Sequence, residues 1–483
     1  MAIFTIATPQ RLTPAYNPIK FYFAGTNSGN AGYKFIFDIY QSGTANKIAE
    51  YRVLPEYGSG YGLIDLSRLL QSKVSFDFEP NNTTVYDAPN SHYQYDVRVG
   101  EEYLTVVQYF TPLTNNGGNV QINVVNSFVV GDQINIVQAG PGNPNLEGLQ
   151  TVIAVGAGYL VVNSPWSLIT NAALNGNIYY ADGRTTITRN INNILKYYVF
   201  NGAIPWTQWP SYLYTDYYLT SPSDKFLTSI PQRNFYATLS QDLWMNAVYG
   251  GPGPGTHKII FYNDAGESFE KSVLATDHVT GNAVGPNNHG TLTPIVGTLP
   301  LIKPNTEYYA YYYEHNGAQV TTDYRVYIDR RVRMEEHSIV FLDRYGSWGS
   351  FAFTGRAYER GTVTREQFNQ DVPGYIDSGA GQWLYYTTDR GYINSYVSVD
   401  NTIDLNTDWM NEDMAAYFTE LISSPYTYFK VSTYYENCEL PASTQYVSCN
   451  IVTSSFEKYK QRNKNLIKQS ITIKLANNDI VNG

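Results

Sequence analysis

Residues 33–54 read YKFIFDIYQSGTANKIAEYRVL. The run from Tyr33 to Tyr40 is rich in Phe, Ile and Tyr, Ser42 and Gly43 close it, and a second apolar run spans Ile48 to Leu54. Aromatic and β-branched runs bounded by Gly and Ser are typical of β-strands. This stretch therefore predicts a β-hairpin. Because similar stretches recur along the chain, we predict a mainly β protein.

Tyrosine is far above ordinary usage, with 45 of the 483 residues. A tyrosine ring buries a large apolar area at a low cost in rotamer entropy, and its hydroxyl can form hydrogen bonds at the solvent-exposed edge of a contact. Protein interfaces therefore favour tyrosine. Hydrophobic residues make up 43% of the chain and charged residues only 15%. This composition indicates a folded protein with an uncharged polar surface, which favours assembly over catalysis.

The length predicts several domains, because one hydrophobic core rarely serves so long a chain. A block poor in tyrosine and rich in Val, Ile, Asn and Gly interrupts the tyrosine-rich strands, and its short β runs fit a small barrel. We predict a discontinuous N-terminal β-sandwich (1–113 and 184–228), an inserted small β-barrel (114–183), a second β-sandwich (229–338) and a C-terminal β domain (339–483).

Two helices interrupt the predicted strands. The segment from Leu63 to Leu70 has leucines at helical spacing, which predicts a short helix. The stronger prediction covers residues 408–422, where Thr407 or Asp408 can cap the helix and Pro425 follows its end. Its apolar stripe is Met410, Met414, Tyr417 and Leu421.

The formal charge of −10 disfavours nonspecific binding to a nucleic-acid duplex, because phosphate binding requires clustered cations. Two basic tracts occur locally, and we interpret them as solvated faces or intersubunit ion pairs. We therefore expect no nucleic-acid partner, except for transient contact with a passing genome. The tracts are Arg325, Arg330, Arg331 and Arg333, and Lys458, Lys460, Arg462, Lys464 and Lys468.

Cys438 and Cys449 are the two cysteines, too few for a disulfide scaffold or a four-cysteine zinc site. They bracket Pro441, so either a disulfide or two reduced thiols is compatible with the sequence. Residues 1–20 contain no basic start followed by an apolar run, and no window approaches the ~20 apolar residues of a membrane span. We expect synthesis in a cytoplasm and no membrane insertion.

The chain contains no phosphate-binding loop, no His-Glu-x-x-His, no Gly-x-Ser-x-Gly and no dinucleotide fingerprint. We therefore predict no enzyme, no cofactor and no metal. Two acids can meet only in the fold, which keeps a glycan-degrading enzyme as a third hypothesis, with Glu335, Glu336 and Asp343 as its candidates. The histidines lack metal-ligand spacing; they are His92, His257, His278, His289, His315 and His337.

Two stretches, residues 128–162 with the turn Phe-Val-Val-Gly-Asp and residues 339–353 with Leu-Asp-Arg-Tyr-Gly-Ser-Trp-Gly, carry a resemblance. They resemble virion structural proteins of tailed phages that infect Bacteroidetes, including crAss-like phages. The first, residues 128–162, reads FVVGDQINIVQAGPGNPNLEGLQTVIAVGAGYLVV and is similar to a small β insertion with a Phe-x-x-Gly-Asp turn before a Glu-Gly-x-x-Thr-Val strand. The second, residues 339–353, reads IVFLDRYGSWGSFAF and is similar to a Trp/Phe-Leu-Asn-Arg-x-Gly-Gly-Trp-Asp signature. The chain departs from this signature at Asp343, Ser347 and Gly349, where the family has Asn, Gly and Asp. The resemblance spans about two-thirds of the chain.

The resemblance implies a structural subunit of the virion tail, tail hub or collar-to-tail assembly, synthesised in the host cytoplasm. We expect a homo-oligomeric ring, because identical contacts close when the rotation permits, and contacts with other tail or collar proteins. The alternative is a tail-tip protein that binds a host surface glycan or receptor. Trp206, Trp209 and Trp383 are its candidate sugar platforms and are equally candidates for interface packing.

The second motif also predicts a structural turn from its residues alone. Arg344 can donate several hydrogen bonds to carbonyl groups at the turn, and Gly346 and Gly349 permit positive φ. Trp348, between the two glycines, is expected to insert into the sandwich core.

Overall fold

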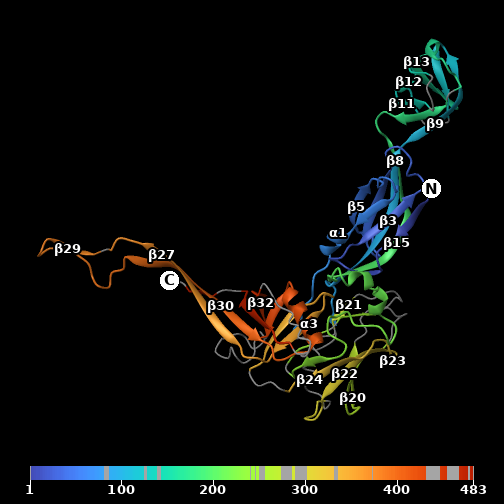
Figure 1. Cartoon of the computed structure of the whole chain (residues 1–483). Coiled ribbons are helices and arrows are strands. Elements are labelled where there is room, and N and C mark those ends of the chain that lie inside the picture. Colours follow the sequence, from blue (N-terminus) through green and yellow to red (C-terminus); the bar gives the residue numbers. More distant parts are fainter. Residues whose placement is uncertain are drawn as a thin grey trace. The chain divides into compact units, whose positions relative to one another are not determined.

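The computed structural model is mainly β, as predicted (Figure 1). The described residues are 2–80, 86–124, 128–138, 143–173, 175–239, 241–244, 246–249, 256–273, 286–288, 302–330, 335–372, 374–430, 446–453, 467–476 and 479–481. The chain forms two compact units, which are treated separately below. The first comprises Met1–Arg11, Pro18–Ser67 and Gln94–Tyr197, and the second Leu12–Asn17, Arg68–Tyr93 and Tyr198–Gly483.

A β-sandwich forms one part of the first unit. Its strands are β1 (Ile3–Ala7), β3 (Lys20–Gly25), β4 (Lys34–Gln41), β5 (Lys47–Val53), β6 (Gly62–Asp65), β8 (His92–Leu104) and β15 (Thr185–Phe200). One sheet has the order β1–β3–β6, and the other includes β15–β8–β4–β5. Phe21 and Phe23 of the first sheet contact Tyr95 and Phe37 of the second, with ring centroids 6.4 and 5.7 Å apart. Strands β4 and β5 pair antiparallel, which confirms the hairpin predicted for residues 33–54.

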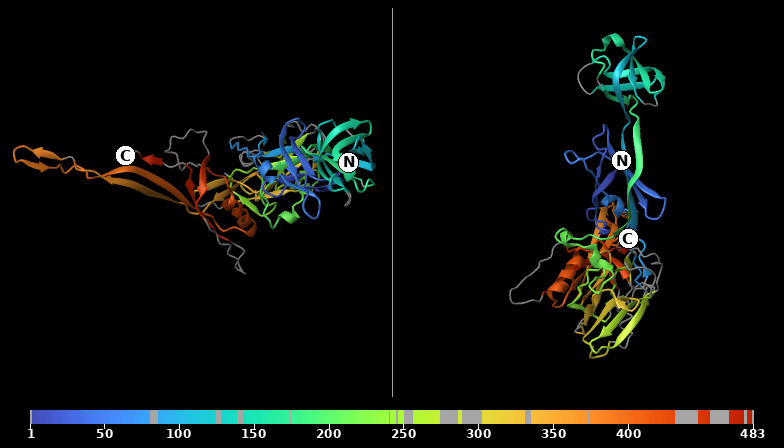
Figure 2. Two further views of the ribbon diagram at one scale, coloured as in Figure 1. Left: turned by 90° about the horizontal axis from the view of Figure 1, so that it is seen from above. Right: turned by 90° about the vertical axis from the view of Figure 1, so that its right-hand side faces the viewer.

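A closed barrel forms the other part of the first unit (Figure 2). Its strands are β9 (Val106–Asn116), β10 (Asn119–Asn123), β11 (Gln133–Gln138), β12 (Gly148–Gly156), β13 (Tyr159–Pro165) and β14 (Gly176–Tyr180). They close in the order β10–β13–β12–β11–β14–β9 around a core of Val, Ile and Leu side chains. The inserted barrel was therefore predicted correctly. It starts earlier than residue 114, because β9 already pairs with β14 from Val106 onward.

Two larger sheets form most of the second unit. The first contains β17 (Phe235–Ala237), β19 (His257–Asn263), β20 (Ser268–Val273), β22 (Tyr308–His315), β23 (Ala318–Gln319) and β24 (Tyr324–Ile328). The second contains β25 (His337–Leu342), β26 (Trp348–Phe353), β27 (Tyr358–Asn369), β30 (Tyr392–Asn406), β31 (Thr427–Lys430), β32 (Tyr446–Ile451), β33 (Ser470–Leu475) and β34 (Asp479–Val481). Their orders are β17–β24–β22–β19–β20, with β23 beside β22, and β26–β25–β31–β32–β33–β30–β27, with β34 beside β30.

Short elements complete the chain. They are β2 (Leu12–Pro14), β7 (Tyr86–Asp87), β16 (Tyr218–Leu219), β18 (Asn246–Tyr249), β21 (Pro286–Asn288), β28 (Tyr375–Asp377), β29 (Gln382–Leu384), and the 3-10 helices η1 (Trp166–Leu168), η2 (Trp209–Ser211) and η3 (Tyr214–Tyr217). Strands β16, β18, β21 and β7 form a small sheet, and β28 pairs with β29.

The two large sheets share one hydrophobic core. Phe226 and Tyr311 on the side of the first sheet belong to the same buried cluster as Phe341, Phe351 and Ile473 of the second. The chain therefore does not divide at residue 338 into a second sandwich and a separate C-terminal domain. Residues 198–228, which were assigned to the N-terminal sandwich, also belong to the second unit, because their apolar side chains enter its core.

Both predicted helices exist with shifted bounds. The short helix α1 spans Ser67–Gln71, because residues 62–65 form β6 instead. The longer helix α3 spans Glu412–Ser423, and Asn411 caps it by accepting a hydrogen bond from the backbone N–H of Met414 at 2.8 Å. The predicted cap at Thr407 or Asp408 is therefore wrong, although the predicted stripe is buried. No described helix is long and apolar enough for a membrane crossing.

Many tyrosines are core residues, contrary to the interpretation that the composition chiefly serves interfaces. Tyr311, Tyr313 and Tyr417 are fully buried. Burial raises the pKa of Tyr311 and Tyr417 well above the ordinary value. Six of the eleven exposed tyrosines among the described residues lie between Tyr358 and Tyr396. The exposed tyrosines of the described residues are thus concentrated in one segment, and fewer of them are available for interfaces than the composition indicated.

Candidate functional site

The turn between β25 and β26 is held by the buried carboxylate of Asp343. Its Oδ1 accepts hydrogen bonds from the backbone N–H groups of Tyr345 and Ser347, both at 2.9 Å. Its Oδ2 accepts one from the backbone N–H of Ser229 at 2.7 Å. Burial raises the pKa of Asp343 to about 6, against the lowering effect of these backbone donors. The carboxylate therefore joins two segments of the second unit.

The two glycines of the turn motif have different roles. Gly346 has φ +71°, a backbone conformation that favours glycine. A Cβ there would also lie 2.0 Å from the carbonyl oxygen of Asn201, so both the backbone and the lack of space exclude a side chain. Gly349 lies in β26 and lacks a positive φ, so that prediction is wrong. A Cβ at Gly349 would lie 2.4 Å from the hydroxyl of Tyr417, so close packing against α3 is what requires a glycine there.

Arg344 also differs from its predicted role. Its guanidinium donates hydrogen bonds to the side chains of Gln208 and Glu420 instead of to the carbonyl groups of the turn. Glu420 lies on α3, so the arginine ties the turn to that helix. This ion pair is largely shielded from solvent.

Trp348 is fully buried in the second unit. Its ring packs against Phe76 and Phe78, with centroids 5.4 and 4.4 Å away, and against Tyr428 at 5.6 Å. The indole Nε1–H donates to the carbonyl oxygen of Asp77 at 2.8 Å. The motif thus packs as a structural element, in the manner that the sequence predicted for Trp348.

The candidate catalytic acids do not converge. Glu335 and Glu336 precede β25 and Asp343 follows it, so the six extended residues of β25 separate Glu336 from Asp343, roughly 23 Å along the strand. Glycoside hydrolysis uses carboxyl groups about 5–10 Å apart. Glu336 accepts hydrogen bonds from the hydroxyls of Thr238 and Ser338 at 2.6 and 3.2 Å. The predicted acids therefore do not form a hydrolytic pair.

Two of the six histidines, His257 and His315, lie opposite each other on the paired strands β19 and β22. The Nδ1 atoms of His257 and His315 lie 3.3 Å apart, and burial lowers the pKa of His315. Within the described part of the chain, no group of three or more His, Cys, Asp or Glu side chains is placed to hold a metal. His278 and His289 lie outside the described residues.

Some of the residues named in the predictions on cysteines and basic tracts lie outside the described residues. They are Cys438, Arg331, Arg333, Lys458, Lys460, Arg462 and Lys464. Cys449 is buried on β32, which raises the pKa of its thiol to about 11. Arg325 covers the ring of Tyr308 at 4.3 Å. Arg330 donates to the carbonyl oxygen of Lys303 at 2.6 Å. These two arginines are therefore engaged within the chain.

The three candidate tryptophans have different environments. Trp206 is 75% exposed and Trp383 54% exposed. Trp209 is half-buried, and its ring stacks on Tyr212 with centroids 5.5 Å apart. One face of Trp209 is therefore already occupied, which leaves Trp206 and Trp383 as exposed platforms.

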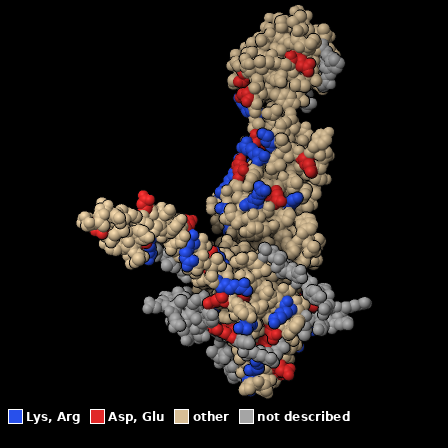
Figure 3. Space-filling model, turned by 60° about the vertical axis from the view of Figure 1, so that its left-hand side comes forward, with Lys and Arg blue, Asp and Glu red and all other residues tan. Residues whose placement is uncertain are grey.

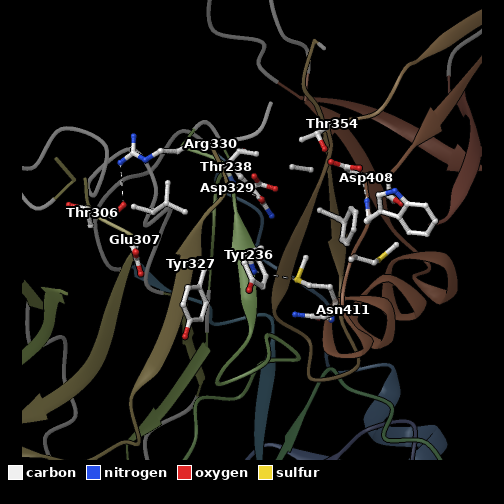
Figure 4. Close-up of a pocket in the computed structure, with 18 of the residues that line it drawn as sticks. Tyr236, Thr238, Thr306, Glu307, Tyr327, Asp329, Arg330, Thr354, Asp408 and Asn411 are labelled. Carbon is white, nitrogen blue, oxygen red and sulfur yellow. Dashed lines mark hydrogen bonds between the residues drawn. The ribbon is translucent and has the colours of Figure 1, made fainter. Parts of the chain in front are cut away.

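A cleft of about 550 Å³ lies between the two large sheets and the start of α3 (Figure 4). Tyr236 and Tyr327 form one wall, with their rings stacked 5.2 Å apart, and the wall with Asp408 and Asn411 faces them. Phe351, Met410 and Met414 supply apolar surface, and Trp409 is 53% exposed at the rim. This volume is within the range of ligand sites. The sequence assigned Met410 and Met414 to a helix stripe and did not predict the cleft.

An exposed β-hairpin projects from the eight-stranded sheet and is hereafter called the arm, residues 358–396 (Figure 1). Its strand β27 pairs with β30 alone, and all twelve of its residues are exposed. Strands β28 and β29 form its end. This hairpin was not predicted from the sequence.

The distal part of the arm carries a concentration of exposed large apolar side chains, hereafter called the aromatic tip. They are Phe368, Tyr375, Ile376, Trp383, Leu384, Tyr385, Tyr386, Tyr392 and Tyr396. Few charges accompany them: residues 368–396 contain three aspartates and one arginine. Figure 3 shows the same scarcity of charge over much of the visible face. The arrangement is suited to contact with another protein surface, because aromatic side chains without charge are enriched at interface centres.

No family model matches the chain, and no curated protein matches it either.

Proposed function

We propose that the chain is a structural subunit of a tailed-phage virion, which assembles with its own copies and with other tail or collar proteins. The resemblance of residues 128–162 and 339–353 to virion proteins suggests the setting. One observation carries the assembly role: the arm presents a concentrated aromatic surface that the described residues of the chain leave uncovered. A ring in the tail, tail hub or collar-to-tail assembly suits such a subunit, because repeated identical contacts close into rings.

The construction of the second unit supports a mechanical role. The buried Trp348, the carboxylate of Asp343 and the Arg344–Glu420 pair all connect segments far apart in the sequence. Such links resist local opening, because each buried group would lose its partner. The predicted catalytic acids, by contrast, lie apart along one strand.

The proposal is tested on native particles. An antibody raised against the purified chain should label one level of the particle, seen by negative-stain electron microscopy, and mass spectrometry should find the chain in purified particles. The control is the same serum after adsorption with the purified chain, which should no longer label the particles. Particles free of the chain would contradict the proposal.

A glycan-binding protein at the tail tip is the second candidate, favoured by the exposure of Trp206 and Trp383. Aromatic faces stack on sugar rings, so binding would depend on these two residues. A glycan array with the wild type and a Trp206→Ala/Trp383→Ala variant tests it. A hit that disappears in the variant supports this function, and an array without hits removes it.

A further inference from the structure

The arm lacks the support that an isolated hairpin needs. A two-stranded hairpin is at best marginally stable in water. Over residues 366–369 and 392–396, each strand of the arm pairs only with the other, and most of these side chains are exposed. Hydrogen bonds join the strands, including Gln367 Nε2 to Asn394 Oδ1 at 2.8 Å. Within the described residues, the covering layer that a sheet normally packs against is absent here.

The tip is nevertheless shaped by specific contacts. Tyr375 and Tyr386 stack with ring centroids 4.5 Å apart. The ring of Trp383 lies over Gly374, which has φ +50°, and a Cβ at Gly374 would come within 2.3 Å of the indole. These contacts hold the strands β28 and β29 in one arrangement while leaving the outer faces of the rings exposed. A shaped apolar surface is what a preorganised contact requires.

The exposed area matches an interface. Taking roughly 200 Å² for each fully exposed large side chain, the exposed fractions of the aromatic tip amount to about 1,000 Å². A standard protein interface buries about 800 Å² on each partner. The side chains of the tip therefore expose an area comparable to one partner's share of such an interface.

The same chain carries a surface that the tip fits in chemistry. The cleft exposes the rings of Tyr236 and Trp409, which are 38% and 53% exposed, whereas Phe351, Met410 and Met414 are nearly buried beneath it. The rest of its lining is mostly polar. Exposed rings pair with other rings in stacked or edge-to-face arrangements, and the polar lining suits the hydroxyl groups of tyrosines. The residues that line the cleft all lie outside the arm, so the arm does not occupy the cleft of its own chain.

We propose that the aromatic tip of one copy occupies the cleft of a second copy of this chain. The partner's identity rests on the proposed function, which requires contacts between copies. Because tip and cleft are different surfaces, the contact is head-to-tail and leaves one tip and one cleft free in a dimer. Further copies add until a ring closes.

Two variants and their mixture test the contact. The tip variant is Ile376→Ser/Trp383→Ser/Tyr385→Ser, and the cleft variant is Trp409→Ser. Trp206→Ser is the matched control, because it also replaces an exposed tryptophan of the second unit. Circular dichroism and melting temperature check that each variant folds, and sedimentation velocity with native mass spectrometry measures assembly.

The wild type and Trp206→Ser should form oligomers. Each of the other variants alone should associate at least tenfold more weakly. An equimolar mixture of the tip and cleft variants should form heterodimers and nothing larger, because only the intact tip of one and the intact cleft of the other can meet. A tip variant that assembles like the wild type, a mixture without heterodimers, or a wild type that stays monomeric at millimolar concentration would overturn the proposal.

Photo-crosslinking gives a readout that does not depend on the stability of the variants. With p-benzoylphenylalanine at position 376 of a light-isotope copy, mass spectrometry should find crosslinks to the peptide around Trp409 of a heavy-isotope copy. Crosslinks to the tip of the heavy copy, or only within the light copy, would overturn the contact. If the chain is found in particles but its oligomer forms equally well with the tip variant, the proposed function stands and this contact is wrong. If the oligomer depends on the tip but the chain is absent from particles, this contact is supported and the proposed function is contradicted.

Discussion

The indole Nε1–H of Trp348 donates a hydrogen bond to the backbone carbonyl oxygen of Asp77, 2.8 Å away and 271 residues earlier in the chain. Phe76 and Phe78 flank this carbonyl in sequence and contact the same indole. The tryptophan of the β25–β26 turn therefore anchors a segment that precedes most of the second unit in the sequence. The polar and the apolar parts of the indole act together, because a buried N–H must find a partner.

Replacing Trp348 with alanine should therefore destabilise the second unit strongly. We expect Trp348→Ala to lower the free energy of unfolding by about 3–5 kcal/mol, because it leaves a cavity among Phe76, Phe78 and Tyr428. Chemical denaturation followed by fluorescence measures this. Trp206→Ala, at an exposed position, should stay within about 0.5 kcal/mol of the wild type. Equal stability of the two variants would contradict the packing role of Trp348.

The position of Gly346 predicts a second strong effect. Gly346→Ala combines a left-handed backbone, which costs a non-glycine residue about 1–2 kcal/mol, with a clash against the carbonyl oxygen of Asn201. We expect a total loss above about 2 kcal/mol, measured by urea denaturation. Gly266→Ala is the control: φ there is +79° with open space around it, so only the backbone cost remains. A similar loss in both variants would show that the clash is relieved.

The buried carboxyl of Asp343 predicts a pH dependence. Its pKa rises from the ordinary 3.8 to about 6, first through burial and further through the charge of Glu420. The folded state therefore holds the proton more tightly than the unfolded state. This contribution stabilises the fold at pH 4 and is lost as the pH rises through 6. At 1.36 kcal/mol per pKa unit, the loss is about 3 kcal/mol.

An Asp343→Asn variant lacks this titration and isolates it from the other acids. Relative to the variant, the wild type should lose about 2.4 kcal/mol of unfolding free energy between pH 4 and pH 7, because the unfolded carboxyl is already partly ionised at pH 4. Denaturant titrations of both proteins at several pH values measure the difference. A constant difference across this range would contradict the raised pKa.

The start of α3 predicts a contrast between two neighbouring residues. Asn411→Ala should cost about 1 kcal/mol, because the side chain caps the helix through the backbone N–H of Met414. Asp408→Ala should have little effect on helix stability, since Asp408 lies outside the first turn. Melting temperatures of the two variants compare them. A larger loss for Asp408→Ala would restore the cap expected from the sequence.

The elements that depend on local pattern follow from the sequence alone. The hairpin at residues 33–54, the barrel within the tyrosine-poor block and the apolar stripe of α3 were all predicted from periodicity, composition and turn residues. Local signals suffice there, because alternation and spacing record which face of an element is buried.

Only the tertiary structure decided the rest. The core shared by the two large sheets, the bond from Ser229 to Asp343 and the cleft at α3 join residues far apart in the chain, and spacing in the sequence does not encode such pairings. The arm escaped prediction for a different reason. Residues 358–369, YERGTVTREQFN, have no buried face and hence no alternation to detect. A strand that is exposed on both faces leaves no apolar stripe of the kind that reveals strands built into a core.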